Sequence, residues 1–391
     1  MRVLVAFDKF KHSLTATDAC ALTATALRAT QPGWTIDTCP LADGGEGFCE
    51  ILTRAAGGEL RTLTVTGPRG TPTLAHFGLV PLAKIPTAAR ALLALPEPLA
   101  PDFVAIVEMA QTSGLDLLPT DRRDPWHATT TGTGELILAA HSAGARAILL
   151  GVGGSATHDL GLGALTALGL RALDATGAPV PIPSPAHWPS IARLDEHLPA
   201  DLPPIRIACD VSNPLLGPSG AAAIYGPQKG LARSRIQELD SSSARLAGQL
   251  LAHFGRPADL PATPGAGAAG GIAFGFLCAA PDARLIPGSD LVSAWLDLDA
   301  RLAAADLVIT GEGCFDDSSL SGKGPGALLA RARQLGKPVH VFAGRLALTT
   351  PPAESGCHCH AITPADQPES LALRSAAANL TRAVTTEFTH K

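Results

Sequence analysis

Several polar loops in this sequence carry residue types that can hold a phosphate, hold a metal ion or move a proton. Each loop carries carboxylate, amine or hydroxyl side chains, and several of them contain glycine as well. Most of the loops follow an apolar run that predicts a buried strand. Such a combination is typical of a nucleotide and magnesium site. The loops occupy residues 8–13, 40–47, 151–159, 209–214, 226–230 and 310–313, with Asp316 and Lys323 just beyond the last.

The most informative loop spans residues 151–159 and reads Gly-Val-Gly-Gly-Ser-Ala-Thr-His-Asp. An apolar run at 147–150 predicts a strand before it, and the small residues of 160–170 predict a helix after it. Backbone N–H groups at a helix N-terminus favour an anion, so the loop predicts phosphate binding. A tight connection that needs glycine only for its shape is the alternative, because short glycine motifs are common. The residues expected to hold phosphate are Gly153, Gly154, Ser155, Ala156 and Thr157.

Acidic residues at strand ends and lysines in glycine-rich loops are the other candidates for chemistry. Asp8 and Asp210 each follow a predicted strand, where a metal ligand or general base is often placed. The structural alternatives are a helix-cap region for Asp8 and an Asx-type turn for Asp210. Lys11 and Lys229 can reach a phosphate as point charges, with a solvated surface position as the alternative for each.

Two familiar nucleotide motifs are not satisfied. Gly322-Lys323 lacks the upstream glycine of a P-loop and is followed by Gly324 instead of Ser or Thr. The run 265–270 matches the dinucleotide pattern in spelling, but it follows Pro-Ala-Thr-Pro and not a strand. We therefore expect neither a P-loop ATPase nor a dehydrogenase, and we interpret 265–270 as a Gly/Ala loop that enters a closely packed helix.

The composition is that of a globular α/β protein, with 391 residues, 46% hydrophobic and 17% charged. The net charge is -5 and no basic stripe is present, so nucleic acid is not an expected partner. Asp8 comes too early for a signal peptide, and no apolar run is long enough to span a bilayer. A cytoplasmic protein with no membrane partner is the expectation.

Eight cysteines in a chain of this length do not suggest a disulfide framework. The run Cys357-His358-Cys359-His360 invites a metal-site interpretation. Alternation along a strand would put both cysteines on one face and both histidines on the other, and no second ligand pair lies at zinc-site spacing. We predict a late strand with two buried thiols and no metal.

Strands and helices alternate at both ends of the chain, which predicts a parallel sheet with ligands at the carboxyl ends of its strands. Thr15 is a candidate N-cap, with Asp18 three residues on. The predicted strands of this part are 2–7, 34–38, 305–309 and 338–342, and the predicted helices are 15–30, 325–335 and 368–391.

The middle of the chain differs from its ends. Residues 65–79 alternate as short antiparallel strands, and 81–101 is a Pro- and Ala-rich stretch that predicts a surface insertion. The fold class we predict is α/β, with a discontinuous Rossmann- or flavodoxin-like parallel-sheet domain and an inserted mixed α/β domain. The expected boundaries are 1–68 and 291–391 for the first domain and 69–290 for the second.

The ordered set of motifs resembles the bacterial type I glycerate kinase family over essentially the whole chain. Ten segments match in family order, far more than any single glycine loop provides. The segments are 8–14, 40–47, 64–68, 108–115, 131–137, 153–157, 209–215, 226–230, 265–271 and 310–325. The chain departs from the family pattern at His158, where Asn is common, at Cys314, where a basic residue is common, and at Ser318, where Gln is common.

The resemblance implies ATP-dependent phosphorylation of D-glycerate to 2-phosphoglycerate with Mg²⁺, and it leaves 3-phosphoglycerate open. It also implies two α/β domains with the site between them. A kinase for another small hydroxy-acid and a non-catalytic sugar-acid sensor are the two alternatives. Whether the protein is a monomer or a homodimer is left open.

The resemblance also suggests roles for individual residues. The catalytic candidates are Asp210, Asp43 and Lys11, of which either aspartate would orient or deprotonate the acceptor hydroxyl. The candidates for substrate binding are Ser13, Glu46 and Asn213. Around the phosphates of ATP, the 153–157 loop would be joined by Lys229, Gly311, Gly313 and Lys323. The candidate magnesium ligands are Asp316 and Glu312.

Overall fold

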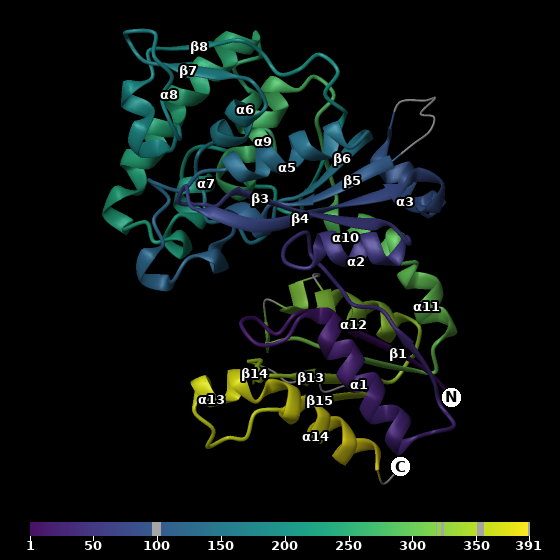
Figure 1. The fold of residues 1–391 in the computed structure, drawn as a ribbon. Helices are drawn as coiled ribbons and strands as arrows, with labels where there is room; N and C mark the ends of the chain where they lie inside the picture. The colour runs from purple at the N-terminus through teal and green to yellow at the C-terminus, as the bar shows by residue number, and fades with distance from the viewer. Residues whose placement is uncertain (96–102, 318, 322–323, 350–355, 390–391) are drawn as a thin grey trace. The chain divides into compact units, whose positions relative to one another are not determined.

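The chain folds into two compact units (Figure 1). The structure, a computed structural model, describes residues 1–95, 103–317, 319–321, 324–349 and 356–389. The first unit comprises Met1–Asp43 and Val292–Lys391, and the second comprises Gly44–Leu291. Both units are α/β, which confirms the predicted fold class. The chain changes unit after Asp43 and not after residue 68, because the strand at 59–66 pairs into the sheet of the second unit.

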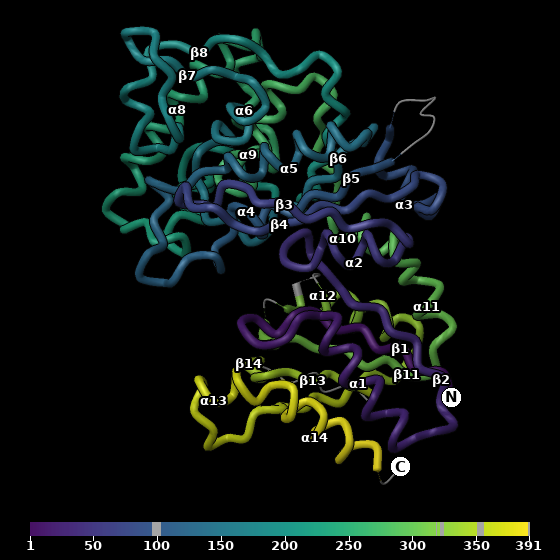
Figure 2. The backbone as a smooth tube through the Cα atoms, viewed as in Figure 1, coloured from purple at the N-terminus to yellow at the C-terminus, as the bar shows by residue number. Residues whose placement is uncertain are grey.

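The first unit has a parallel sheet in the order β15-β13-β11-β1-β2. Four of these strands, β1, β2, β11 and β13, are labelled in Figure 2. Numbered along this unit, the order is 5-4-3-1-2, which is the flavodoxin-like arrangement. The order reverses between β1 and β11, so the topological switch point lies between these strands. The strands are β1 (Arg2–Phe7), β2 (Thr35–Thr38), β11 (Leu307–Gly311), β13 (Val339–Ala343) and β15 (Cys357–Ala361), and a separate parallel pair is formed by β12 (Cys314–Asp316) and β14 (Arg345–Ala347).

Helices cover both faces of this sheet. Val3, Val5 and Phe7 of β1 are buried in one core with residues of α1 and α14, and the alternation of β1 turns Leu4 and Ala6 to the other face. The helices of the unit are α11 (Leu298–Ala304), α12 (Gly324–Gln334), α13 (Glu369–Arg374), α14 (Ala376–Phe388) and α1 (Ala16–Thr30), while α10 (Gly288–Trp295) crosses the unit boundary. The single helix expected at 368–391 is therefore two helices.

Local signals at two termini can be compared directly with the sequence. Thr15 is the N-cap of α1, and its hydroxyl accepts from the backbone N–H of Asp18 at 3.0 Å, as predicted. The strand predicted at the Cys-His-Cys-His run is β15. Its two thiols, Cys357 and Cys359, are only partly buried, so the prediction of buried thiols was wrong. Because β15 is an edge strand, one side of it has no neighbouring strand to cover it.

The second unit has a mixed sheet in the order β10-β9-β6-β5-β4-β3. The pairs from β10 to β5 are parallel, and β4 and β3 add an antiparallel edge, as the alternation of 65–79 predicts. The strands are β3 (Glu59–Thr66), β4 (Pro72–Pro81), β5 (Phe103–Glu108), β6 (Ala145–Gly151), β9 (Ile205–Ala208) and β10 (Arg284–Ile286), with a small pair β7 (Arg171–Leu173) and β8 (Arg193–Asp195).

The helices of the second unit are α2 (Phe48–Ala55), α3 (Thr87–Leu93), α4 (Ala110–Ser113), α5 (Thr131–Ser142), α6 (Leu162–Ala167), α7 (Ala221–Tyr225), α8 (Ile236–Phe254) and α9 (Ala268–Ala279). The expected insertion at 81–101 lies partly outside the described residues, and its described part includes α3 with buried Ala89 and Leu93. No helix in the described part of the chain is both long and apolar enough to cross a membrane.

The Gly/Ala run at 265–271, before and within α9, allows close packing, as predicted. Gly270 and Gly271 have φ values of +73° and +90°, which favour glycine. A Cβ on Gly270 would lie 2.1 Å from the carbonyl oxygen of Thr157. The run therefore lets α9 approach the 151–159 loop closely.

Candidate functional site

Two acidic residues stand at the topological switch point of the first unit. Asp8 follows β1 and Glu312 follows β11, and these strands pair in parallel up to Phe7 and Gly311. The backbone N–H of Asp8 donates to the carbonyl oxygen of Gly311 at 3.0 Å, which fixes the two strand ends together. In open α/β sheets this is the place where ligands bind.

The surroundings of both carboxyl groups disfavour their ionisation in the absence of a cation. Burial raises the pKa of Asp8 to about 6, and Asp43 adds to the rise while Lys9 opposes it. Burial likewise raises the pKa of Glu312 to about 7, with Asp8 and Asp316 adding to it. Oε1 of Glu312 is buried and has no hydrogen-bond partner among the described residues. Carboxylate oxygens are the ligands that Mg²⁺ prefers, so this donor set fits that ion.

Glycines bring the neighbouring backbones close to these carboxyls. A Cβ on Gly313 would lie 3.1 Å from the backbone nitrogen of Lys11, and one on Gly324 would lie 3.2 Å from Oδ2 of Asp8. Gly324 is the first residue of α12, so the carboxylate of Asp8 lies at the positive end of that helix. A Cβ on Gly311 would clash with the carbonyl oxygen of Phe342, which gives this glycine a packing role as well. Lys323 lies outside the described residues.

The remaining predicted residues of the first unit lie around this pair. Nζ of Lys9 is 3.4 Å from Oδ1 of the exposed Asp43. Lys11 is exposed on a tight turn, and Ser13 of that turn donates its hydroxyl to the carbonyl oxygen of Phe10 at 3.0 Å.

Two further observations concern Asp316 and Asp8. Oδ1 of Asp316 accepts from the backbone N–H of Ser319 at 3.1 Å, so part of its carboxylate holds its own loop. Asp8 was considered from the sequence as a strand-end metal ligand or general base but was not included among the predicted site residues. The helix-cap alternative for it is excluded because Thr15 caps α1, and the order of the strands is the signal that singles it out.

The glycine-rich loop after β6 is held largely by the protein's own groups. The N–H of Gly153 donates to Gly44 at 3.0 Å, and the N–H of Ala156 donates to Ser113 at 2.8 Å. Ala156 and Thr157 are buried, whereas Gly154 is exposed. The first half of this loop is therefore the part that offers surface to a phosphate, and the roles of Ala156 and Thr157 stay predictions.

Two more site candidates lie beside this part of the loop. Gly153 is partly exposed, and Ser155 keeps 8% of its surface. Oε1 of Glu46 lies 3.9 Å from where a Cβ on Gly154 would be, so the structure brings Glu46 to the exposed part of the loop.

The positive helix end expected to attract phosphate is occupied by Asp159. Its carboxylate accepts from the backbone N–H groups of Thr130, Gly161 and Gly163 at 2.7, 3.2 and 3.2 Å. These groups lie at the N-termini of α5 and α6, whose first helical residues are Thr131 and Leu162. The N–H groups of this helix end are therefore already paired with a buried carboxyl, so they do not support phosphate binding by the loop.

Other acidic residues at strand ends in the second unit also accept hydrogen bonds from N–H groups at helix N-termini. Glu108 is 3% exposed, and its carboxylate accepts from the N–H of Cys49 in the first turn of α2. Burial raises the pKa of Glu108 to about 7. The exposed Asp210 accepts from the N–H of Ser289 at 3.0 Å and from its hydroxyl at 3.2 Å, in the first turn of α10. Asp210 therefore caps a helix that is distant in the sequence. The sequence pattern alone suggested only a local Asx-type turn as its structural role.

Two more predicted residues are engaged within the second unit. Lys229 is 1% exposed, which excludes a solvated surface position, and its Nζ donates to Oγ of Ser155 at 2.8 Å and to the carbonyl of Thr157 at 2.7 Å. Burial lowers its pKa to about 7. Asn213 donates to the carbonyl of Ser219 and accepts from the hydroxyl of Tyr225. Lys229 thus braces the glycine-rich loop, and Asn213 braces its own loop.

The surroundings of His158 favour its neutral form. It is fully buried, its Nε2 lies 3.0 Å from Oγ of Ser243, and its Nδ1 has no partner among the described residues. Burial and the nearby Lys229 lower its pKa to about 3. His158 is therefore a hydrogen-bonding substitute for the family's usual Asn and cannot add charge to a phosphate site near neutral pH.

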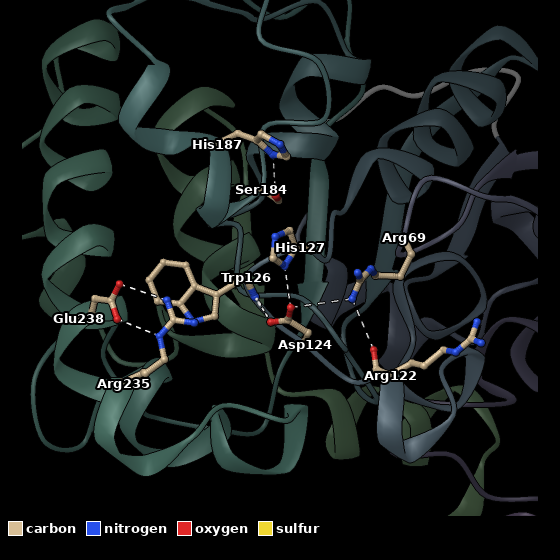
Figure 3. A network of polar contacts seen from close by, with 9 residues as sticks. All are labelled: Arg69, Arg122, Asp124, Trp126, His127, Ser184, His187, Arg235 and Glu238. Atoms are coloured by element: carbon tan, nitrogen blue, oxygen red, sulfur yellow. Dashed lines mark hydrogen bonds and ion pairs between the residues drawn. The ribbon is translucent and has the colours of Figure 1, made fainter.

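A polar network near α8 involves none of the predicted site residues (Figure 3). Oδ1 of Asp124 accepts from the N–H of Trp126 at 2.9 Å, and Oδ2 lies 2.6 Å from Nδ1 of His127. The guanidinium of Arg235 lies 4.2 Å above the Trp126 ring and pairs with Glu238. Because Arg235 lies over Trp126 and pairs with Glu238 of α8, we assign the network to the attachment of loop 120–127 to α8.

Comparison with known proteins decides the family. The glycerate kinase family model matches residues 3–389. The chain belongs to the glycerate kinase family. Glycerate 2-kinase of Escherichia coli is 37% identical over 88% of this chain and 86% of its own, and glycerate kinase of Halalkalibacterium halodurans is 38% identical over 88% and 85%. A crystal structure described as a candidate glycerate kinase 2 of Salmonella typhimurium LT2 has a TM-score of 0.74 and 34% identity, and covers 100% of this chain and 96% of its own.

Family membership makes the chain an enzyme of the kinase type and confirms the resemblance stated from its motifs. It also bears on one departure from the family pattern. Cys314 replaces a residue that is commonly basic, and the guanidinium of Arg345 lies 3.7 Å from its sulfur. A positive charge is thus supplied to this position from the neighbouring strand β14.

Proposed function

We propose that this chain transfers the terminal phosphoryl group of ATP to the 2-hydroxyl of D-glycerate, with Mg²⁺ as the accompanying cation. The observation that carries the proposal is the pair of partly desolvated carboxyl groups, Asp8 and Glu312, at the switch point of a flavodoxin-like sheet. Family membership and the name of the Escherichia coli relative support the choice of substrate and of the 2-position.

Different residues of the chain are proposed to bind Mg²⁺ and the anionic oxygens of the substrates. Asp8 and Glu312 are the proposed Mg²⁺ ligands, and Asp316 adds a carboxylate beside them. Bound Mg²⁺ would screen the charge of the phosphates during transfer. The exposed Lys11 would favour anionic oxygen, and Gly153 and Gly154 offer the exposed part of the 151–159 loop.

The acceptor hydroxyl needs a group that orients it or accepts its proton. Asp43 and Asp210 are the proposed candidates because both carboxylates are exposed. Asp43 is paired with Lys9, and Asp210 is held by Ser289, so each carboxylate has a fixed anchor. Ser13 and Glu46 are the proposed contacts to the remaining oxygens of the substrate.

The proposal is tested by measuring ADP release from purified protein. We expect release that requires both D-glycerate and Mg²⁺ and that stops when EDTA is added. A panel of small hydroxy-acids in the same assay separates glycerate from related acceptors. If ADP release is equal with and without glycerate, the activity is not that of a glycerate kinase. Glycerate binding with no ADP release would favour a non-catalytic sensor.

A further inference from the structure

Three metal-ligating side chains from three separate elements meet in the first unit. They are His340 of β13, His360 of β15 and Glu387 of α14. These three elements are labelled in Figure 1. In the parallel pair β13–β15, His340 is level with His358, and Phe342 is level with His360. Because residues two apart on a strand share a face, all four side chains lie on one face of the sheet.

The three groups lie close enough to share one ion. Nδ1 of His340 is 3.0 Å from Nε2 of His360 and 3.7 Å from Oε1 of Glu387. The other ring nitrogen of His360, Nδ1, is 3.9 Å from Oε2 of Glu387. One ligand atom from each of the three residues lies within 4.8 Å of the other two. An ion bound at about 2.0–2.2 Å from each ligand in tetrahedral geometry needs ligand separations of about 3.3–3.6 Å. Binding would therefore lengthen the 3.0 Å contact between the imidazoles and shorten the longest separation.

Aromatic packing holds the two imidazole rings in place. The rings of His340 and His360 are nearly parallel, with an angle of 4° between them. The ring of His340 also stacks on His358 at 4.8 Å and meets Phe388 at 5.0 Å, while His360 stacks on Phe342 at 4.5 Å. A ligand set whose orientations are fixed by packing has little conformational entropy to lose when an ion binds.

We propose that His340, His360 and Glu387 form a binding site for a divalent transition-metal ion, with Zn²⁺ as the best fit. Two imidazoles and one carboxylate favour Zn²⁺ over Mg²⁺, and three protein ligands leave a fourth position for water. The His340 side chain is 5% exposed, whereas those of His360 and Glu387 are each 23% exposed. The site is thus anchored in the core and open on one side, and it shares no residue with the proposed Mg²⁺ cluster.

This site cannot be predicted from a sequence motif, because its three ligands lie far apart in the chain. Within the Cys-His-Cys-His run only His360 contributes a ligand atom, and the other two come from positions 340 and 387. By alternation Cys357 and Cys359 lie on the opposite face of β15. The thiols therefore provide a matched control, since they are the zinc ligands that the sequence alone would suggest.

The test is a Zn²⁺ titration of the full chain against a chromophoric chelator, after EDTA treatment and in excess Mg²⁺. We expect one tight site per chain. His360→Ala and Glu387→Gln should each weaken it at least about tenfold. His358→Ala, which removes a stacking ring but no ligand atom, and the double variant Cys357→Ser with Cys359→Ser should keep binding near the native value.

A thermal melt gives an independent readout on the same proteins. Zn²⁺ should raise the Tm of the native chain and of the two controls, and it should leave the Tm of His360→Ala unchanged, because an ion stabilises only the folded state that binds it. No tight site in the native chain would leave the pair as a hydrogen bond between two imidazoles and overturn the proposal. Loss of binding only in the cysteine variant would overturn it as well.

Discussion

At the scale of single residues, the first unit differs from the second in what its strand-end acids do. Asp159, Glu108 and Asp210 accept from N–H groups at helix N-termini, so their carboxyl oxygens already have partners in the protein. Glu312 instead has a buried oxygen with no partner among the described residues, and Asp8 lies beside it. A buried carboxyl without such partners gains most from a cation, which is why we place Mg²⁺ there.

The raised pKa values of Asp8 and Glu312 predict a pH dependence for Mg²⁺. Protons compete with Mg²⁺ for these groups below a pKa of about 6 for Asp8 and about 7 for Glu312. The KM for Mg²⁺ should therefore fall as pH rises from about 5.5 to about 8, by up to about tenfold per unit below the pKa. Steady-state kinetics over this range measure it.

Glu312→Gln is the matched variant for this prediction. The amide that this change introduces cannot titrate. The KM for Mg²⁺ in the Glu312→Gln variant should therefore be higher than in the native chain and should change less with pH. The same change removes a carboxyl whose pKa is raised on folding. Such a group destabilises the folded state increasingly as pH rises from its unfolded pKa of 4.5 toward about 7. The metal-free variant should thus be at least as stable as the native chain at pH of about 8, and a native Mg²⁺ profile in this variant would contradict the assignment.

Asp210 has two separable roles, one at the N-terminus of α10 and one proposed in catalysis. Asp210→Asn keeps an oxygen that can accept from Ser289 but removes the charge, whereas Asp210→Ala removes both. We expect kcat to fall by about 100-fold or more in each variant, the usual scale for a positioned acid–base group. Only Asp210→Ala should have a lower Tm than the native chain.

The opposite pattern would be equally clear. If Asp210→Asn keeps kcat within a few-fold and only Asp210→Ala lowers Tm, the carboxylate is a helix cap and nothing more. The proposed proton acceptor is then Asp43, and Asp43→Asn should show the loss of kcat instead.

At the scale of elements, buried carboxylates set the positions of helices in the second unit. Asp159 joins the N-termini of α5 and α6 by accepting from Thr130, Gly161 and Gly163. In Asp159→Asn the amide NH₂ would face these donors. We expect a loss of about 3 kcal/mol or more in unfolding free energy, measured by urea denaturation.

An exposed aspartate in a similar role is the control for Asp159. Asp174 accepts from the backbone N–H groups of Thr176 and Ala178 in a surface turn. Asp174→Asn should cost much less, because water can satisfy the groups that the change releases. Equal losses in the two variants would mean that burial does not decide the effect.

The elements that sequence reasoning located well are those fixed by local patterns. The strand at 2–7 was predicted with its observed bounds, and the α1 N-cap was predicted because Thr15 and Asp18 interact with each other. The boundary after Asp43 was missed, because only pairing with β4 decides which sheet takes the strand at 59–66. The local sequence pattern also suggested that acidic residues at strand ends face a ligand. It could not show that several of these carboxylates accept hydrogen bonds from helices distant in the sequence.

At the scale of the whole molecule, the family relationship covers nearly the full chain and both of its units. The ten ordered motifs carried that relationship from the sequence alone. The proposed residues come from both units: Asp8, Asp43 and Glu312 from the first, and Glu46 and Asp210 from the second. The structure assigns several of the other motif residues to loop bracing and close packing, as Lys229 and Gly270 show.

The central claim is the transfer of a phosphoryl group from ATP to the 2-hydroxyl of D-glycerate, and phosphorus NMR of the reaction mixture tests it most directly. Purified chain with ATP, Mg²⁺ and D-glycerate should give equal amounts of ADP and 2-phosphoglycerate, whose phosphorus couples to the single proton on carbon 2. A phosphorus signal coupled to two protons would show 3-phosphoglycerate and contradict the proposed position. A spectrum with ADP and inorganic phosphate but no phosphoglycerate would contradict the proposed function itself.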